Sequence, residues 1–444
     1  MTINFDIIAE GIRNLNTIQC SGTIERITGL LVESHGPAVV IGELCKIYRA
    51  DGESVSAEVV GMRGDAVQLM VLGDMLGLGR GDRVVGTGSR LGVAVGNGVL
   101  GRVVNGLGNP IDGKGIIAET SHYQVYNDPP HPLTRERIRE SVSTGIRAID
   151  GCLTIGKGQR MGIFAGSGVG KSTTLGMIAR NTSASINVIA LVGERGREVR
   201  EFIERDLGEE ALARSVVVVA TSDRPAMERI KAVYTAFTIA EYFRDQGMDV
   251  MLMMDSITRF AMAQREVGLS IGEPPSTKGY TPSVFSLMPK LLERAGMSTK
   301  GSITGLFTIL VENDDMNDPI GDTARAILDG HVVLTRQLAA RGHYPPIDIM
   351  ESVSRVMPDV VTEKHRKAAS KFKELISVYD EAEDLINIGA YVKGSNPMID
   401  RSVKYHADII SFLRQDIMES APFRETIVRM EQLYDRVVAD EKVL

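Results

Sequence analysis

The sequence predicts an α/β core that is preceded by a small β-barrel and followed by a helical domain. Short β-rich runs separated by glycine and charged turns occupy residues 21–92. Continuous apolar runs then alternate with helical segments over residues 93–362. Residues 363–444 are charged and helix-like, without a clear strand. Residues 1–20 form a separate amphipathic segment ahead of the barrel.

The length and composition are those of a globular protein with more than one domain. Of the 444 residues, 43% are hydrophobic and 24% are charged, and the net charge is −7. This acidic balance argues against a surface devoted mainly to nucleic acid. Cys20, Cys45 and Cys152 have neither metal-site nor disulfide spacing, so we expect the reducing cytosol. The sequence shows no secretory signal and no apolar run long enough to cross a membrane.

The N-terminal segment places Phe5, Ile8, Ile12 and Leu15 at helical spacing. A free amphipathic helix of this length is marginal in water. The segment therefore either packs on its own domain or binds a partner, and its residues alone favour neither.

The β-rich runs that follow are short, and their spacing is typical of a small barrel. We expect strands at 22–28, 38–41, 55–60, 66–71 and 82–85. Residues 92–110 are rich in glycine and are interpreted as a connection to the next domain.

The middle of the chain contains continuous apolar runs, which suit parallel strands covered by helices on both faces. These runs are 188–192, 216–220, 250–254 and 305–311, with helical segments such as 197–207 and 226–246 between them.

A glycine-rich turn lies between the apolar run 161–164 and the helix-like segment 173–180. Strand, glycine-rich turn, Lys-Ser and helix together form the phosphate-binding loop (P-loop) of nucleotide hydrolases. Backbone N–H groups of such a turn converge on phosphates, and the helix N-terminus adds positive potential. We therefore expect nucleotide to contact Ala165, Gly166, Ser167, Gly168, Val169, Gly170, Lys171, Ser172 and Thr173.

Within this loop, Lys171 would reach the β- and γ-phosphates, and the Ser172 hydroxyl would hold Mg²⁺. Ala165 departs from the usual pattern, which opens with glycine. Alanine costs little there if its φ is an ordinary negative one.

Two carboxylates end buried runs of the predicted sheet. Asp255 follows the run 250–254, where a Mg²⁺-organising aspartate would sit, although an aspartate at this place can also cap a helix. Glu194 follows the run 188–192 and could orient the attacking water. The alternative for Glu194 is a surface turn residue paired with Arg195 or Arg197.

Two further residues are candidates on chemistry alone. Arg355 could supply the extra cation that phosphoryl transfer often takes from a neighbouring subunit, but the chain has many arginines and physics alone does not single it out. Tyr344 could stack on an adenine, or it could be a structural aromatic residue before Pro345 and Pro346.

Together these motifs resemble the hexameric ATPases related to the catalytic subunit of rotary ATP synthase. The matching phrases are 166–172, 193–202, 254–256, 329–331 and 352–355. Residues 265–269, 272–275, 291–296 and 313–319 look like the type III export branch of that family, and 385–397 looks like its flagellar members. The resemblance covers most of the chain and implies a RecA-like P-loop core between the barrel and the helical domain.

The resemblance also implies roles by position and ATP with Mg²⁺ as the bound groups. It implies phosphate and Mg²⁺ binding by Lys171 and Ser172, a water-positioning role for Glu194, Mg²⁺ organisation by Asp255, an arginine finger acting in trans at Arg355, and adenine stacking by Tyr344.

The function implied by the resemblance is ATP hydrolysis that unloads or unfolds export substrates and delivers them to a membrane export gate. The implied partners are five further copies in a homohexamer, a stalk protein, substrate–chaperone complexes, and a regulator dimer at residues 1–20. The implied location is the cytoplasm, with peripheral association to the inner face of the cell membrane and no nucleic acid.

Four alternatives remain open at this point. The client could be a virulence needle instead of a flagellum, or the chain could be the catalytic subunit of a rotary ATPase. A ring helicase that moves on RNA is disfavoured because the chain has no Trp, and the barrel region offers only Tyr48 with scattered arginines for base stacking. A docking scaffold with an inactive nucleotide site would show no ATP turnover.

Overall fold

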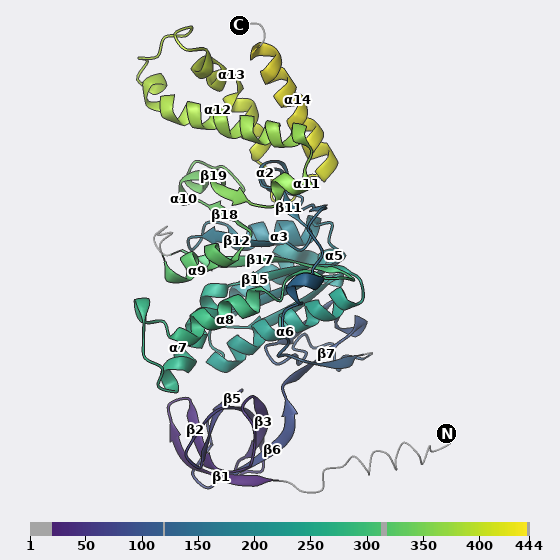
Figure 1. Ribbon diagram of the computed structural model, residues 1–444, viewed down its shortest axis with the longest axis vertical. Coiled ribbons are helices and arrows are strands. Elements are labelled where there is room, and N and C mark those ends of the chain that lie inside the picture. The colour runs from purple at the N-terminus through teal and green to yellow at the C-terminus, as the bar shows by residue number, and fades with distance from the viewer. Residues whose placement is uncertain (1–19, 119, 312–317, 442–444) are drawn as a thin grey trace, which may run out of the picture. The chain divides into compact units, whose positions relative to one another are not determined.

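The computed structural model describes residues 20–118, 120–311 and 318–441 (Figure 1). The predicted amphipathic segment at 1–20 lies outside the described residues, apart from Cys20. The chain forms two compact units. The smaller one consists of the described residues up to Gly92 together with Ser270–Gly272, and the larger one contains the rest.

The smaller unit is a closed barrel of six strands, as predicted. The strands are β1 (Ser21–Thr28), β2 (Leu31–His35), β3 (Glu43–Tyr48), β4 (Ser54–Arg63), β5 (Ala66–Val71) and β6 (Arg83–Arg90). They close in the order β1-β2-β5-β4-β3-β6. Fully buried side chains such as Val32, Ile47 and Leu69 fill the interior, since alternate residues of a barrel strand face inward.

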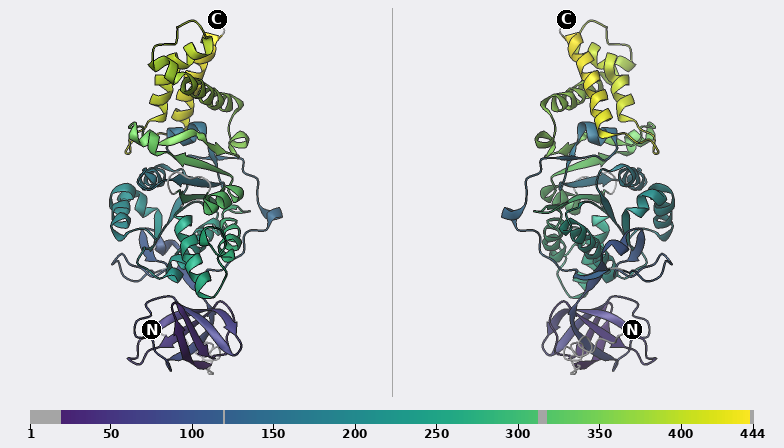
Figure 2. Two further views of the ribbon diagram at one scale, coloured as in Figure 1. Left: turned by 90° about the vertical axis from the view of Figure 1, so that its left-hand side faces the viewer. Right: turned by 90° about the vertical axis from the view of Figure 1, so that its right-hand side faces the viewer.

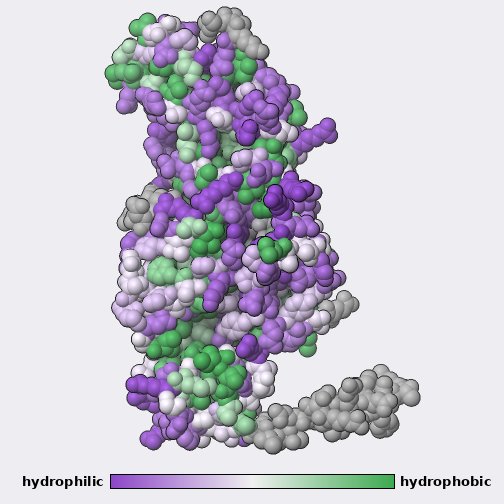
Figure 3. All heavy atoms as spheres, viewed as in Figure 1, coloured by the Kyte–Doolittle hydropathy of each residue, from purple (hydrophilic) through white to green (hydrophobic). Residues whose placement is uncertain are grey.

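One predicted barrel strand is wrong. Residues 38–41 form a loop after Pro37, in which Val40 and Ile41 are 59% and 62% exposed. A short apolar run does not by itself distinguish a strand from a loop, and here the neighbouring β2 and β3, which were not predicted, complete the barrel. Figure 3 shows apolar side chains gathered on part of the visible face of the barrel.

The larger unit is built on a nine-stranded sheet. Its strands lie in the order β19 (Ile347–Ser354), β18 (Gly330–Leu334), β12 (Arg160–Ala165), β17 (Ser302–Leu310), β15 (Asp249–Asp255), β13 (Ile186–Val192), β14 (Ser215–Ala220) and β8 (Arg102–Asn105), and β16 (Gly296–Met297) pairs with β17. The strands from β18 to β8 are parallel, and β19 runs antiparallel to β18. The four predicted apolar runs are strands of this sheet.

The glycine-rich region at 92–110 is more than a connection, contrary to the expectation. It supplies β8, which pairs with β14 at one edge of the sheet. It also supplies β7 (Gly92–Val95), which pairs with β9 (Ser121–Gln124). A four-residue strand between glycines leaves too short a pattern to recognise in the sequence.

Helices cover both faces of the sheet (Figure 2). On one face α6 (Ala226–Asp245) packs along β13, β14 and β15. On the other, Leu175 and Ile178 of α3 share a buried core with Ile163 and Leu191. The remaining helices of this part are α4 (Gly196–Glu201), α5 (Gly208–Ala213), α7 (Ile257–Ser270), α8 (Pro282–Leu292), α9 (Pro319–Ile327) and α10 (Arg336–Ala340), and α3 spans Lys171–Asn181.

Shorter elements complete the core. A π-helical segment, Phe202–Leu207, joins α4 to α5, single 3₁₀ turns lie at Asn97–Val99, Pro132–Thr134 and Thr277–Gly279, and β10 (Ser141–Val142) pairs with β11 (Ile155–Gly156).

The C-terminal region is helical, as predicted. It contains α11 (Met357–Val360), α12 (Glu363–Asn387), α13 (Pro397–Leu413) and α14 (Phe423–Glu441). The last three pack against α2 (Arg147–Cys152), and α11 packs against β11. The Thr362 side chain caps α12 by accepting from the His365 backbone N–H. Phe372 and Phe412 contact each other edge to face. Both belong to the buried apolar cluster that also includes side chains of the sheet. Among the helices of the described residues, none combines the length and apolarity needed to cross a membrane.

Asp150 on α2 is fully buried and organises the turn before that helix. Its carboxylate accepts hydrogen bonds from the Thr144 N–H and hydroxyl, the Gly145 N–H and the Ser143 hydroxyl. Burial raises the pKa of Asp150 to about 6, although the hydrogen bonds act in the opposite direction. The folded state therefore binds a proton more tightly than the unfolded chain, whose Asp pKa is roughly 4.

This linkage predicts how Asp150 affects stability with pH. The free energy of unfolding contributed by Asp150 should fall as pH rises from roughly 4 to about 6, and stay low above that. Asp150→Asn removes the titration and replaces one acceptor oxygen with a donor, so it should destabilise by roughly 1–3 kcal/mol. In urea unfolding, the deficit of the variant should be larger at pH 4.5 than at pH 7.5. A deficit that grows with pH would contradict the assignment.

Candidate active site

The predicted P-loop is present as a strand, a glycine-rich turn and a helix. β12 ends at Ala165, and α3 begins at Lys171. Gly168 and Gly170 have φ of 78° and 105°, conformations that favour glycine. Ala165 is the last residue of the strand and pairs with Leu310 and Leu334, so its backbone is extended. The alanine that departs from the sequence pattern is therefore compatible with this loop.

Lys171 lies between two carboxylates that come from different strands. Its Nζ is 3.2 Å from Glu194 Oε1 and also contacts Asp255 Oδ1. β13 and β15 are parallel neighbours, so the residues that follow or end them meet at the same edge of the sheet. The structure thus brings together three of the predicted site residues, which are separated by up to 84 positions in the chain.

The charges of this cluster are tightly coupled. Burial acts to lower the pKa of Lys171, but the negative charges of Asp255 and Glu194 outweigh it and raise that pKa. The pKa of Glu194 is raised as well, mainly by burial and further by the charge of Asp255, against the effect of Lys171. The cluster therefore holds a lysine that stays protonated beside a glutamate that takes up a proton more readily than an exposed one.

Asp255 is oriented by a residue that the sequence did not point to. Thr308 on β17 donates its hydroxyl to Asp255 Oδ1 at 2.8 Å. A lone threonine inside the apolar run 305–311 was the available signal, because a buried hydroxyl needs a partner.

The donors at this edge suit Mg²⁺, which prefers oxygen ligands. The Ser172 hydroxyl on α3 and the Asp255 carboxylate are oxygen donors of this kind. Within the described residues, no group of three or more His, Cys, Asp or Glu side chains could hold a metal by itself. This set fits an ion that arrives with phosphates and keeps several waters, which is typical of Mg²⁺ in nucleotide sites.

Two more residues beside Glu194 were missed by the sequence reasoning. Gly193 has φ of 73°, and a Cβ there would lie 2.9 Å from Arg259 Cβ, so the Arg259 side chain passes directly beside this turn. Arg259 Nε is buried without a hydrogen-bond partner among the described residues. Glu198 interacts with Glu194 and forms an ion pair with Arg195 at 2.7 Å. Arg259 stands four positions after Asp255 and is the third residue of α7, within its first turn.

Tyr344 is half exposed and lines a cavity of about 700 Å³ with residues of α13 and of the segment after it. The Gln415 N–H donates to the Tyr344 carbonyl, which ties this loop to the helical region. Pro346, two positions on, lies 3.9 Å from the place where a Cβ would stand on Gly170. The loop that carries Tyr344 and Pro346 therefore passes beside the P-loop.

Arg355 lies at the opposite edge of the sheet from Lys171. Its N–H donates to the Asp329 carbonyl, level with Arg160 at the start of β12, whereas the P-loop follows Ala165 at the end of that strand. Five residues of strand span roughly 16 Å. Arg355 therefore does not join the cluster of Lys171, Glu194 and Asp255 in its own chain.

Comparison with known families identifies three matching regions. Residues 24–88 match the beta-barrel domain of the ATP synthase alpha/beta family, and residues 145–354 match its nucleotide-binding domain. Residues 361–432 match the T3SS EscN ATPase C-terminal domain. The chain belongs to the ATP synthase alpha/beta family. Within that family it is an ATPase of the type III export branch, which confirms the predicted family and order of domains.

Relatives of two kinds align along nearly the whole chain. The flagellum-specific ATP synthase of Bacillus subtilis is 54% identical over 93% of this chain and 94% of its own length. That of Treponema pallidum is 48% identical over 95% of each. The type 3 secretion system ATPase of Xanthomonas euvesicatoria is 48% identical over 93% of this chain and 94% of its own.

Solved structures agree with the fold. The assembled ATPase EscN from the type III secretion system of enteropathogenic E. coli is 47% identical, with a TM-score of 0.88 over 93% of this chain and 99% of that chain. EscN in complex with its central stalk EscO is 46% identical, with a TM-score of 0.86 and the same coverage.

Proposed function

We propose that this chain hydrolyses ATP with Mg²⁺ at the cluster of Lys171, Glu194 and Asp255, and that hydrolysis serves flagellar type III protein export. The observation that carries the proposal is this cluster itself, at the carboxyl ends of parallel strands beside the P-loop. Carboxylates and a lysine in this place have the charges that phosphoryl transfer to water needs.

Nucleotide binding is supported by the geometry of the P-loop and by the exposed Tyr344 ring. The backbone N–H groups of residues 166–170 and the start of α3 face the phosphates, which Lys171 contacts in exchange for its carboxylate partners. Ser172 and Asp255 would hold Mg²⁺, Thr173 follows on the helix, and the half-exposed Tyr344 ring would stack on the adenine. When bound, Mg²⁺ neutralises charge that develops on the phosphates.

Glu194 is the group that orients the attacking water. Its carboxylate is held beside Lys171 by the turn at Gly193, whose N–H donates to the Ala220 carbonyl at 2.7 Å. Because its pKa is raised, the ionised Glu194 carboxylate is a stronger base than that of an exposed glutamate. Arg259, whose buried Nε lacks a partner among the described residues, is placed to contact the departing phosphate.

Arg355 completes the site of a neighbouring subunit. It cannot reach the P-loop of its own chain, and within the described residues it pairs with no carboxylate, so its charge is available to an incoming phosphate. A chain that carries the hydrolytic cluster at one sheet edge and the arginine at the other can build identical sites around a closed ring. We therefore propose a homohexamer, supported by the likeness to the assembled EscN ATPase, and a stalk protein as partner, as in the EscN–EscO complex.

The flagellar client is favoured because flagellum-specific relatives align at up to 54% identity. Export substrates with their chaperones, a membrane export gate and a regulator dimer at residues 1–20 complete the proposed set of partners. The proposed location is cytoplasmic, at the inner face of the cell membrane. A virulence secretion system is the second candidate, since type 3 secretion ATPases align at 48%.

The water-positioning role predicts the effect of Glu194→Gln. The variant keeps size and hydrogen bonding but cannot accept a proton, so ATP binding should persist while kcat falls by about a hundredfold or more. Steady-state hydrolysis and fluorescent-nucleotide binding measure both quantities. Glu204→Gln, which changes an exposed glutamate paired with Arg200, is the control and should leave both unchanged. Near-normal turnover in Glu194→Gln would end this assignment.

The finger role predicts complementation between subunits. Arg355→Ala should abolish hydrolysis in homogeneous rings, because no site receives its arginine. Mixing it with Glu194→Gln should restore part of the activity, since some interfaces then pair an intact cluster with an intact arginine. The measurement is ATPase activity of mixed rings verified by differential tagging. A verified mixed ring without activity would argue against action in trans.

The flagellar assignment predicts the phenotype of a deletion. Removing the gene from its organism should abolish filament assembly and swimming, and the wild-type gene should restore both, whereas Glu194→Gln should not. Filaments are scored by electron microscopy and swimming in soft agar. Normal filaments together with loss of protein secretion would instead support the second candidate.

A further inference from the structure

Asp329 is bonded through every one of its polar groups. Its carboxylate receives a bidentate pair from Arg160, with Nε–Oδ2 at 3.0 Å and Nη2–Oδ1 at 3.1 Å, and the Arg160 backbone N–H also donates to Oδ2. The Asp329 N–H donates to the Arg160 carbonyl. Its own carbonyl accepts from the Arg355 N–H at 3.0 Å and from Gln159 Nε2 at 3.1 Å. Asp329 thus joins the start of β12 to the end of β19.

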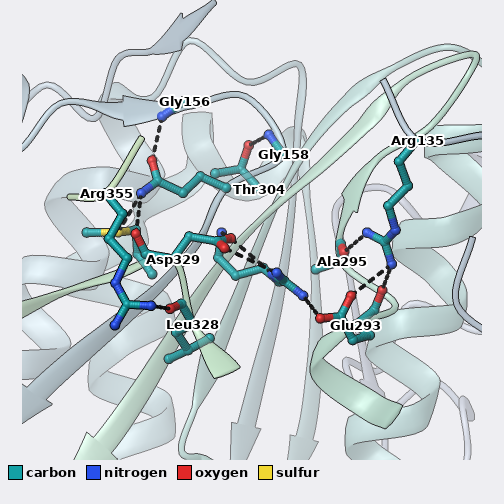
Figure 4. A network of polar contacts seen from close by, with 12 residues as sticks. Arg135, Gly156, Gly158, Glu293, Ala295, Thr304, Leu328, Asp329 and Arg355 are labelled. Atoms are coloured by element: carbon teal, nitrogen blue, oxygen red, sulfur yellow. Dashed lines mark hydrogen bonds and ion pairs between the residues drawn. The ribbon is translucent and has the colours of Figure 1, made fainter. Parts of the chain in front are cut away.

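Contacts beyond this pair extend the network on the Arg160 side. Arg160 also pairs with Glu293, whose other carboxylate oxygen is 3.2 Å from Arg135. Arg135 donates in turn to the Ala295 carbonyl at 2.9 Å. Figure 4 shows these contacts reaching from Arg135 through Glu293 toward Asp329. The pair is therefore supported from the end of α8 and from the segment before β10.

The side chain of Arg355, in contrast, is held weakly. Its guanidinium donates to the Leu328 carbonyl at 3.3 Å, as Figure 4 shows. It also donates to the Arg325 carbonyl at 3.4 Å, and both acceptors lie at the end of α9. These are long bonds to uncharged acceptors. The direction of the side chain therefore depends on where the backbone of Arg355 lies. That backbone is held by the hydrogen bond from the Arg355 N–H to the Asp329 carbonyl at 3.0 Å.

We propose that Asp329, fixed by Arg160, is the positioning residue for Arg355. The proposal rests on the trans role proposed above for that arginine. Because Asp329 holds Arg355 through the backbone, the Arg355 guanidinium pairs with no carboxylate in the described residues. Its charge is therefore not neutralised within its own chain. A shift of about 1 Å in such a group can cost roughly a hundredfold in rate, which is why an arginine finger needs a fixed base.

The test uses the same complementation of mixed rings. Asp329→Asn should lower kcat by about tenfold or more, with ATP affinity within about twofold of wild type. Mixed with Glu194→Gln it should regain activity, because its own cluster is intact and the partner supplies a positioned arginine. Mixed with Arg355→Ala it should show no more activity than Asp329→Asn alone, because neither subunit then presents a well-positioned finger. A merely structural role would not separate these two mixtures.

A second variant and a control keep the test decisive. Arg160→Lys keeps the charge but loses the bidentate fork, and should complement as Asp329→Asn does even if that variant folds poorly. Asp112→Asn breaks a similar bidentate pair with Arg102 on β8 and should leave turnover near wild type. β8 is the outermost strand on the side of the sheet away from β19.

Three outcomes would overturn the proposal. The first is a near-normal kcat in both Asp329→Asn and Arg160→Lys. The second is a loss of activity in Asp329→Asn that mixing with Glu194→Gln does not restore, although the same mixing restores Arg355→Ala. The third is a defect in Asp112→Asn as large as that in Asp329→Asn. If Arg355→Ala and Glu194→Gln fail to complement each other in verified mixed rings, the trans role falls first and the positioning role falls with it.

Discussion

The polarity of the parallel sheet is the constraint on which the rest of the structure depends. Because β12, β13 and β15 run the same way, the P-loop, Glu194 and Asp255 meet at one edge. The same polarity, with β19 returning antiparallel, carries Arg355 to the other edge. The two halves of the proposed hydrolytic site therefore face away from each other within one chain. In the proposed mechanism a second copy is needed to bring the halves together, and a closed ring would give every copy such a neighbour.

Electrostatics explains why the half-site on one chain is stable on its own. A buried lysine without a partner would lose its charge, but two carboxylates beside Lys171 keep it protonated. Phosphate oxygens carry the same sign of charge as these carboxylates, so nucleotide can replace them as partners of the lysine. In the proposed mechanism this exchange would leave Asp255 for Mg²⁺ and Glu194 for water. The contacts of Lys171 thus keep the cluster organised for a ligand of matching charge.

Much of this architecture could be predicted from the sequence, for reasons that lie in particular segments. Long apolar runs such as 216–220 identify strands because both of their faces are buried, and the glycines around Lys171 identify the turn between strand and helix. The errors lie in short segments. Residues 38–41 were predicted as a strand but form an exposed loop, and residues 92–110 were interpreted as a connection but supply the strand β8. Thr308 and Arg259 were not identified from the sequence, because each is placed at the site by neighbours that are distant in sequence. Arg355 could be singled out only by family resemblance, since nothing local distinguishes it from other arginines.

In the proposed arrangement, Asp329 would hold the backbone of Arg355 in place while leaving its guanidinium unpaired with any carboxylate of the described residues. A carboxylate paired directly with Arg355 would hold it firmly but would also neutralise the charge that the neighbouring phosphate needs. Here the bidentate ion pair is formed between Asp329 and Arg160, not with Arg355. Asp329 contacts Arg355 only through a backbone hydrogen bond. The guanidinium makes only long hydrogen bonds, to carbonyl oxygens at the end of α9. Rigidity is thus supplied to the main chain, and the charge remains available at the tip of the side chain.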